Sequence, residues 1–437
     1  MAVLGFSDAA IATAVKEVYS PRLRKLFSEA QDTEKTLGIT IDKNPDPALN
    51  LRIPLKLSRM RSHKASKQEA ATYPITAPGK NTYFETEWIR LYQSLNMDGL
   101  FMHLTNQQGA AHRFEKWMTA AQEDLLKDRI ENCERMFFGD GTGVYGTVTT
   151  GATIAAGGVM TVSHPAGLSN SALQYFTDDN GYFIVISSDG TAFRGGFKLQ
   201  YRDWANNQIT VDRAITVQTG DLIVAGPPTA AVDPIAESSY NAEMPGVQTW
   251  ITSGTLYGVA AGTSPRWTSK IIAAAGAGYN EEYLFSLLRY VGNREATRAG
   301  LDLTGCKFVM HQCMETEHRR AYGGGAEYSQ GNFSFKRGEN EQSIEYHGQN
   351  VPVHYAKLCR PDAIYLGDWR VVEKRVAKDW TLDGAAGGTL QRAGTSDAYW
   401  MGWKSYQGAF TNSRARLAAI TGLSYDADVV AEVNAGV

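Results

Sequence analysis

Cysteine is scarce in this sequence, and long apolar runs are absent. The 437 residues include four cysteines, Cys133, Cys306, Cys313 and Cys359. So sparse a set does not make a disulfide framework, and we expect reduced, partly buried thiols. No stretch approaches the roughly 18 consecutive apolar residues that suggest a membrane-spanning helix, so no membrane partner is expected.

Positive charge is not in excess either. The formal net charge is −3 and the pI is near 6.3. Because dedicated nucleic-acid binders are normally basic, we expect this chain to bind any nucleic acid weakly and without sequence specificity. Hydrophobic residues make up 43% of the chain and charged residues 20%, which indicates a folded protein. The length suggests roughly two to four globular units.

The common catalytic motifs are missing. The sequence contains no Gly-x-Ser-x-Gly elbow, no His-Glu-x-x-His pair and no phosphate-binding loop. Zinc-binding side-chain types gather at Cys306, His311, Cys313 and His318, but their spacing matches no closed zinc motif. We therefore expect structural roles for these four side chains, and no catalytic residue, cofactor or metal.

The strongest helical pattern covers residues 106–137. Apolar side chains recur there at intervals of three, four and seven residues, with Thr105 or Asn106 as the N-cap and Gly139 at the end. Thirty-two residues at about 1.5 Å each span roughly 48 Å. This length exceeds the diameter of a small domain, so the helix is expected to act as a spine.

Two alternating segments precede this helix. Residues 51–59 and 82–94 alternate apolar and polar side chains, with Phe84, Trp88 and Tyr92 expected on one face of the second segment. They are predicted to pair as a long antiparallel hairpin, and the link at 60–81 is unusually long and polar.

The hairpin segment and the helix carry opposite charge. Residues 51–80 hold seven basic residues and one acidic residue, a net charge of +6, whereas residues 115–134 hold three basic and six acidic residues, a net charge of −3. We expect the basic segment to lie over the acidic helix of a neighbouring subunit. The candidate contact residues are Arg59, Arg61, Lys64, Lys67, Glu123, Asp124, Asp128 and Glu131. A solvated loop and a nucleic-acid contact are the alternatives, although only Tyr73 is nearby as a stacking aromatic.

The rest of the chain alternates between β-rich and mixed segments. Two short helices are predicted at 7–30 and an extended arm at 31–50. A small antiparallel β module is predicted between 147 and 230, with turns at Asp189-Gly190 and Asn206-Asn207. The later elements are helices at 280–298 and 312–321, a glycine-rich loop at 323–338, and strands at 307–310, 351–355, 363–366, 370–376 and 408–423.

Five short motifs accompany this order of elements. They are Phe-Phe-Gly-Asp-Gly-Thr-Gly at 137–143, Met-Pro-Gly-Val-Gln-Thr-Trp at 244–250, Gly-Thr-Leu-Tyr-Gly-Val at 254–259, Ser-Pro-Arg-Trp-Thr at 264–268 and Tyr-His-Gly-Gln-Asn-Val-Pro-Val at 346–353. With the order of elements, they resemble the major capsid proteins of tailed double-stranded DNA bacteriophages. The resemblance implies an α+β, Hong Kong 97-like capsid fold with a long spine helix, a projecting E-loop hairpin, an α/β axial domain and an inserted antiparallel β module.

The resemblance also implies a division of the chain. It gives an N-terminal arm (1–50), an E-loop hairpin (51–98), the spine helix of a peripheral domain (99–147), the inserted β module (148–230), a connection (231–270), the axial domain (271–370) and closing strands of both domains (371–437).

The function implied by the resemblance is structural, not enzymatic. Such a chain self-assembles, in the host cytoplasm, into pentamers and hexamers of an icosahedral head, and in the virion it encloses DNA held non-specifically. The resemblance implies separate scaffold and portal proteins and a decoration protein as the further partners. Two alternatives remain open. One is an encapsulin-like bacterial nanocompartment shell, and the other is a β-rich metal-dependent enzyme or carbohydrate-binding protein with Cys306, His311, Cys313 and His318 as its metal site.

Overall fold

The computed structural model describes residues 32–43, 51–57, 81–98, 111–168, 171–176, 181–227, 233–264, 267–293, 302–315, 317–318, 342–382, 391–392, 398–426, 428–430 and 433. The helices predicted at 7–30, the cap at Thr105 or Asn106 and the glycine-rich loop at 323–338 lie outside these ranges, as does the hairpin link from 58 to 80. Within the ranges, no helix combines the length and the apolar character needed to cross a membrane.

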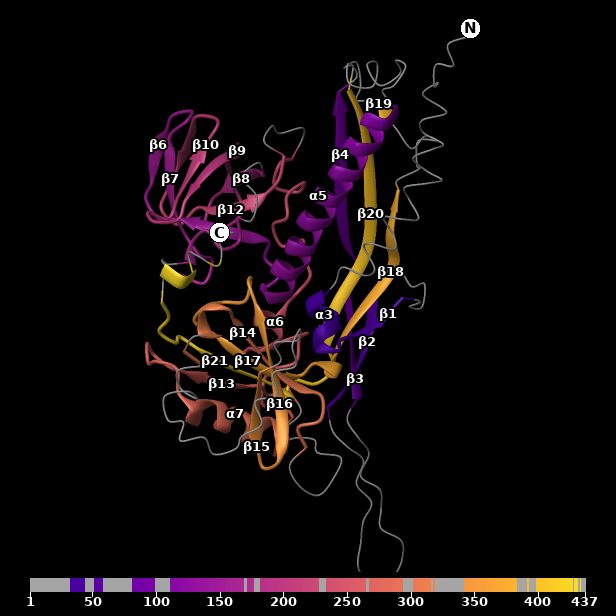
Figure 1. Ribbon diagram of the computed structural model, residues 1–437, viewed down its shortest axis with the longest axis vertical. Helices are drawn as coiled ribbons and strands as arrows, with labels where there is room; N and C mark the ends of the chain where they lie inside the picture. Colours follow the sequence, from indigo (N-terminus) through magenta and orange to yellow (C-terminus); the bar gives the residue numbers. More distant parts are fainter. Residues whose placement is uncertain are drawn as a thin grey trace, which may run out of the picture.

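The fold is α+β, as predicted, and its longest part is a limb made of one helix and a sheet (Figure 1). Helix α5 (Ala111–Phe138) has 28 residues, about 42 Å at 1.5 Å per residue. It ends at Gly139, whose N–H donates to the carbonyl of Met136. The sheet is built on β20 (Ala398–Thr411), which pairs with β4 (Ile89–Asp98) on one side and with β18 (Val372–Leu382) and β19 (Gln391–Arg392) on the other.

The predicted hairpin is confirmed at its base. Strands β2 (Leu51–Lys56) and β3 (Asn81–Thr86) pair antiparallel, from Leu51 opposite Thr86 to Lys56 opposite Asn81. The alternation is also confirmed, because Ile53, Leu55 and Leu57 are all buried.

The second half of the hairpin differs from the prediction at Tyr92. This side chain is 66% exposed and does not share an inner face with Phe84 and Trp88. The two residues between β3 and β4 interrupt the strand and shift its alternation by one residue, so Leu91 and Gln93 turn inward instead. A shift of one residue moves every following side chain to the other face of a strand.

The segment predicted as an extended arm is only partly extended. Residues Asp32–Leu37 form a short helix, α3, and β1 (Thr40–Asp42) then runs parallel to β18. Leu37 and Ile39 are buried, and Lys374 donates to both carboxylate oxygens of Glu34 at 2.7 and 2.9 Å. The arm is therefore docked on the core here, through an ion pair that joins residues 340 positions apart in the sequence.

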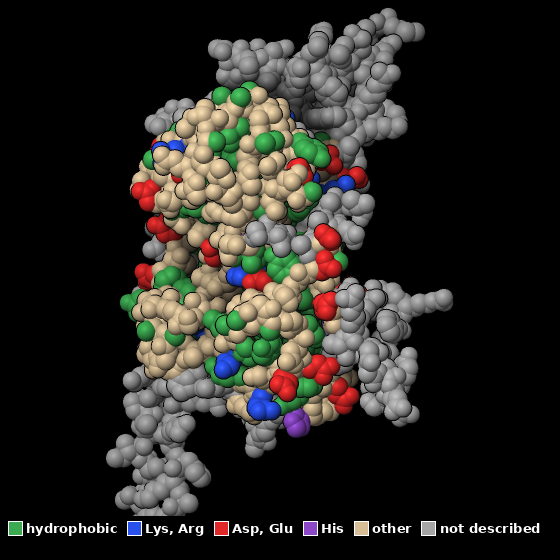
Figure 2. Space-filling view, turned by 90° about the vertical axis from the view of Figure 1, so that its left-hand side faces the viewer, with side chains coloured by type: hydrophobic (Ala, Val, Ile, Leu, Met, Phe, Trp, Pro, Cys, Tyr) green, Lys and Arg blue, Asp and Glu red, His purple; other side chains and the backbone are tan. Residues whose placement is uncertain are grey.

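The β-rich segment after α5 closes into a six-stranded barrel. The order is β10 (Gln208–Val211), β7 (Val159–Ser163), β5 (Val144–Val148), β12 (Leu222–Ala225), β8 (Tyr182–Ile186) and β9 (Phe193–Asp203); β6 (Ala152–Ile154) and β11 (Ile215–Val217) form a separate pair. Both predicted turns join neighbouring strands, with positive φ angles at Gly190 and Asn207. In Figure 2, charged side chains on this upper lobe lie mainly at its margins, and hydrophobic side chains are scattered over its face.

A six-stranded mixed sheet completes the fold. Its order is β13 (Lys270–Ala273), β21 (Leu417–Thr421), β17 (Ile364–Asp368), β14 (Cys306–His311), β16 (Gln349–Ala356) and β15 (Gln342–Tyr346). Helix α7 (Glu281–Asn293) packs on it through Leu284, Leu287, Leu288 and Val291, which are fully buried, as the predicted helical spacing required. Residues 313–315 and 317–318 are also helical.

One close backbone contact fixes how these parts meet. Gly246 precedes the short helix α6 (Val247–Trp250) and lies against the last turn of α5. A Cβ atom at position 246 would lie 2.3 Å from the carbonyl oxygen of Met136 and 2.4 Å from that of Phe137. Real Cβ atoms do not approach backbone oxygens so closely, so only glycine fits there.

Replacing Gly246 by alanine should therefore destabilise the subunit by about 1–3 kcal/mol or more, because the backbone must move to make room. Urea unfolding followed by tryptophan fluorescence measures this loss. Gly278→Ala is the matched control, since a Cβ there meets nothing closer than the Ser424 Oγ at 3.9 Å. Equal midpoints for the two variants would contradict the prediction.

Candidate intersubunit surface

The four acidic residues predicted at an intersubunit contact lie in the middle of α5 and towards its C-terminal end. Glu123, Asp124 and Asp128 are exposed, and Glu131 is partly buried. Positions 124, 128 and 131 follow the spacing of one helix side, so these carboxylates form a single row. Asp128 is also used within the chain, because its carboxylate accepts a hydrogen bond from the Asn132 amide at 2.9 Å.

The basic partners of this row, Arg59, Arg61, Lys64 and Lys67, lie outside the described residues. A contact between the acidic row and the basic link therefore stays a prediction.

Two buried arginines fix α5 to the elements around it. The guanidinium of Arg129 lies 4.5 Å from the ring centre of Trp380 in β18. Arg135 forms a buried ion pair with Glu243 and lies 4.0 Å from the ring centre of Tyr145 in β5. Burial alone would lower the pKa of Arg135, but the Glu243 carboxylate outweighs it and raises that pKa. The helix is thus held by the limb sheet and by the barrel at the same time.

The first two sequence motifs meet at the end of α5. Gln248 Nε2 donates to the carbonyl of Phe138 at 2.7 Å, and Thr249 Oγ1 donates to the carbonyl of Asp140 at 2.6 Å. These bonds join positions about a hundred residues apart, and they satisfy carbonyls at a helix end and in the following turn. Trp250 packs edge-on against Phe137, with ring centres 5.8 Å apart.

The third and fourth motifs support the β2–β3 hairpin. The ring of Tyr257 stacks on that of Phe84 in β3, with centres 4.4 Å apart. Ser264 Oγ donates to the carbonyl of Leu57, and the buried indole of Trp267 packs in the same cluster. The base of the hairpin is therefore fastened to the body of the subunit.

The fifth motif makes a tight turn. His347 and Gly348 both have positive φ angles, 50° and 73°, between the antiparallel strands β15 and β16. Two consecutive positive φ angles are typical of a two-residue hairpin turn.

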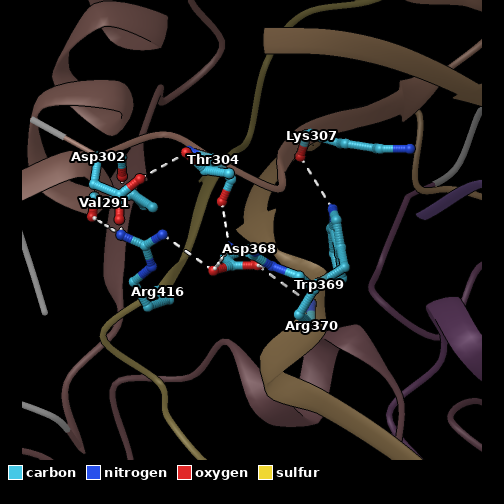
Figure 3. Close-up of polar contacts among 8 residues, drawn as sticks. All are labelled: Val291, Asp302, Thr304, Lys307, Asp368, Trp369, Arg370 and Arg416. Carbon is cyan, nitrogen blue, oxygen red and sulfur yellow. Dashed lines mark hydrogen bonds and ion pairs between the residues drawn. The ribbon is translucent and has the colours of Figure 1, made fainter. Parts of the chain in front are cut away.

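A buried charge network holds the six-stranded sheet to its surroundings (Figure 3). Asp368, at the end of β17, accepts hydrogen bonds from Arg370 at 2.8 Å and from Arg416 at 3.0 Å. Arg416 also donates to the carbonyls of Val291 and Asp302, at 3.3 and 3.0 Å. The carboxylate of Asp368 therefore positions two arginines. Through Arg416 it also holds the end of α7 and the loop before β14.

Burial would raise the pKa of Asp368, but the hydrogen bonds from Arg370 and Arg416 outweigh burial and lower the pKa below its ordinary value. The sequence reasoning missed this network. The sequence does place an arginine and an aspartate next to otherwise apolar strands. Because a buried charge needs a partner, such residues indicate a buried ion pair. Its partner, however, lies 48 positions away in the sequence.

The possible zinc ligands are occupied in other ways. His311 Nδ1 accepts from the backbone N–H of Cys313 at 3.0 Å, and His318 Nδ1 is bonded to the hydroxyl of Tyr279. Burial raises the pKa of the Cys306 and Cys313 thiols to about 12, and it lowers the pKa of His311 and His318 to about 4. Across the described part of the chain, no three His, Cys, Asp or Glu residues are grouped to hold a metal ion.

Comparison with known proteins finds similarity only at the level of structure. No protein-family model matches the sequence, and no curated protein does. The chain is similar to the capsid of the native GTA particle computed with C5 symmetry, at 12% identity over 90% of this chain and 91% of that chain, with a TM-score of 0.45. It is also similar to the capsid of cyanophage A-1(L), at 9% identity over 90% and 93%, with a TM-score of 0.46.

A third similar structure is the holo-SrpI encapsulin complex from Synechococcus elongatus PCC 7942, at 9% identity over 89% of this chain and 87% of that chain, with a TM-score of 0.36. The similar structures are thus phage capsids and an encapsulin, the same classes of shell that the sequence suggested. Each of these TM-scores is below 0.5.

Asp368→Asn should lower the free energy of unfolding by about 3–5 kcal/mol at pH 7, because it leaves two arginines, one of them buried, without a carboxylate. The lowered pKa means that Asp368 stabilises the fold fully above about pH 4 and loses this effect as the pH falls through its pKa in the folded state. The difference from the unmodified protein should therefore shrink below pH 4.

Urea unfolding between pH 3 and pH 8 measures both effects, with the exposed Asp428→Asn as the control. A stability difference that stays constant with pH would show that the negative charge of Asp368 is not what stabilises the network.

Proposed function

We propose that the chain is the major capsid protein of a tailed bacteriophage, with a Hong Kong 97-like fold and no catalytic activity. In this proposal α5 is the spine helix, the β2–β3 hairpin is the base of the E-loop, and the six-stranded sheet with α7 is the core of the axial domain. Copies associate into pentamers and hexamers that close as an icosahedral shell around DNA.

The exposed acidic row on α5 carries this proposal. Arg129 and Arg135 fix the helix in place, while Glu123, Asp124 and Asp128 in its middle part are exposed to solvent. The same sequence contains the strongly basic stretch 51–80, which starts in the fastened base of the hairpin. Segments of opposite charge on identical chains favour contacts between copies.

The mildly acidic composition fits a wall that holds the packaged DNA non-specifically. Scaffold and portal proteins, and a decoration protein, are the expected partners, with assembly in the host cytoplasm and residence in the virion. The domain boundaries proposed from the sequence place the β module at 148–230, whereas the barrel also takes in β5, from Val144.

A charge exchange tests the proposed contact. Reversing Arg59, Arg61, Lys64 and Lys67 to glutamate should prevent shell formation, and reversing Glu123, Asp124 and Glu131 to lysine should do the same. Asp128 is left unchanged because it bonds to Asn132. Each exposed ion pair is worth roughly 0.2–1 kcal/mol, so three or four pairs at every repeated contact decide assembly while leaving the subunit folded.

Combining both sets of reversals should restore shells, which electron microscopy and sedimentation of the expressed protein detect. Normal shells from either set alone, or no recovery in the combined variant, would refute this contact. Electron microscopy also separates the alternatives: DNA-filled heads from infected cells support a phage capsid, whereas small uniform shells loaded with a cargo enzyme support a nanocompartment.

The barrel should be dispensable for folding of the remainder. Val144 in β5 lies directly opposite Val224 in β12, so the chain enters and leaves the barrel at neighbouring points. Replacing residues 144–225 by a short glycine-serine linker should leave a soluble subunit that unfolds cooperatively. Leu125→Pro should be far more damaging, since a proline inside α5 costs about 3 kcal/mol or more. Circular dichroism and thermal unfolding compare them; equal collapse of both would assign the barrel to the core.

A further inference from the structure

We propose that residues 32–42, which form α3 and β1, are a strap across the junction of the limb and the six-stranded sheet, and that this strap opens as one piece while both sheets stay folded. The ion pair between Glu34 and Lys374 holds the strap closed. This inference concerns the single subunit and does not depend on the proposed function.

The strap is bonded to both sheets. Strand β1 pairs with β18 of the limb over its three residues, from Thr40 to Asp42. On the other side, Lys307 Nζ in β14 of the six-stranded sheet donates to the carbonyl of Thr36 in α3. In Figure 1, α3 lies where the limb meets the six-stranded sheet. A few consecutive residues therefore connect the two sheets across their junction.

The two parts of the strap are joined rigidly. The N–H of Ile39 donates to the carbonyl of Glu34 at 3.1 Å, and the N–H of Gly38 donates to the carbonyl of Lys35 at 3.0 Å. Gly38 has a positive φ angle of 80°. This pair of bonds around a left-handed glycine is the Schellman motif, which closes a helix end by hydrogen bonds within the segment. Helix α3 and β1 therefore move together.

The packing of the strap is uneven. Leu37 and Ile39 are buried in a cluster with Phe137 of α5. At the first turn of α3, however, Thr33 and Glu34 line a cavity of about 310 Å³ whose other walls include α5 and β16. A helix of six residues is not stable by its own hydrogen bonds, so α3 depends on these partial contacts. Segments with few buried contacts open more readily than the sheets they lie on.

The carboxylate of Glu34 is the strongest polar contact of the strap. It accepts two hydrogen bonds from Lys374, whose side chain is almost fully buried. Arg129 of α5 lines the same cavity as Glu34 and is also buried. Burial lowers the pKa of Arg129, and the negative charge of Glu34 is one of those that oppose this shift. One carboxylate of the strap thus acts on a buried cation in β18 and on another in α5.

Opening of the strap is therefore coupled to hydration of Lys374. A buried ammonium group without a carboxylate is strongly unfavourable, so the ammonium must gain water when Glu34 leaves. The opened form consequently differs from the closed form in a way that chemistry can detect, because Lys374 becomes accessible to reagents.

Hydrogen exchange and lysine acetylation of the full chain test the inference. In the unmodified chain, the amides of β1 should exchange at least about tenfold faster than those of β17 in the centre of the six-stranded sheet. An acetylating N-hydroxysuccinimide ester should modify Lys374 at a rate that follows the exchange of β1 and not that of β17.

Three variants identify the interaction that holds the strap. Glu34→Met should raise both the exchange of β1 and the acetylation of Lys374 at least about tenfold, because it leaves the buried ammonium without its carboxylate. Glu373→Met is the matched control, since Glu373 is next to Lys374 but bonds to Arg375 at 2.6 Å. Combining Glu34→Met with Lys374→Met should return the exchange of β1 to within about threefold of the unmodified chain, because both charges are then removed.

Several results would overturn the inference. Equal exchange of β1 and β17 in the unmodified chain would mean that the strap does not open separately. Unchanged rates in Glu34→Met, or equal acceleration by Glu373→Met, would mean that the ion pair does not hold it. A Glu34→Met subunit that fails to fold would assign the pair to the core of the subunit. None of these measurements requires shells, so they leave the proposed function untouched.

Discussion

The last turn of α5 is the place on which the arrangement of the whole subunit depends. Gly246 approaches the carbonyls of Met136 and Phe137 so closely that no side chain fits, and Gly143 lies as close to Ser239. At this place the chain passes from α5 into the barrel, and it comes back from the barrel to α6. Trp250 and Trp369 pack against Phe137 here. This one close contact therefore positions α5, the barrel and α6, and a backbone shift of an ångström here would displace all three.

The packing around α5 leaves part of its surface exposed. Arg129 and Arg135 are buried against aromatic rings, whereas the carboxylates of Glu123, Asp124 and Asp128 face water. A surface held so firmly changes little on association, so weak charged contacts can add up without a large ordering cost. Weak contacts also separate again when they are misplaced, which a closed shell of many copies requires.

The sequence predicted the elements whose evidence is local. The spacing of Leu284, Leu287, Leu288 and Val291 gave α7, and the alternation of Ile53, Leu55 and Leu57 gave β2, because each pattern follows the period of one element. The phase of β4 was wrong at Tyr92, since a two-residue interruption reverses an alternation without leaving a clear signal in composition. The helix α3 was missed because a six-residue segment with few apolar residues depends on tertiary contacts.

For the candidate surface, too, the sequence predicted only the residues that lie close together along the chain. The acidic row could be found because its members are close in sequence and share one helix side. The network of Asp368, Arg370 and Arg416 could not be assembled, since its oxygen and nitrogen atoms meet only after β17 and β21 have paired.

The ion pair between Glu34 and Lys374 has a consequence for the early part of the chain. Lys374 is almost fully buried, and the carboxylate that neutralises it arrives on α3, a segment attached to the core by few other elements. A cut beyond Ile39 would remove this carboxylate from a buried ammonium group. The core therefore depends on a charge that the early part of the chain carries to it.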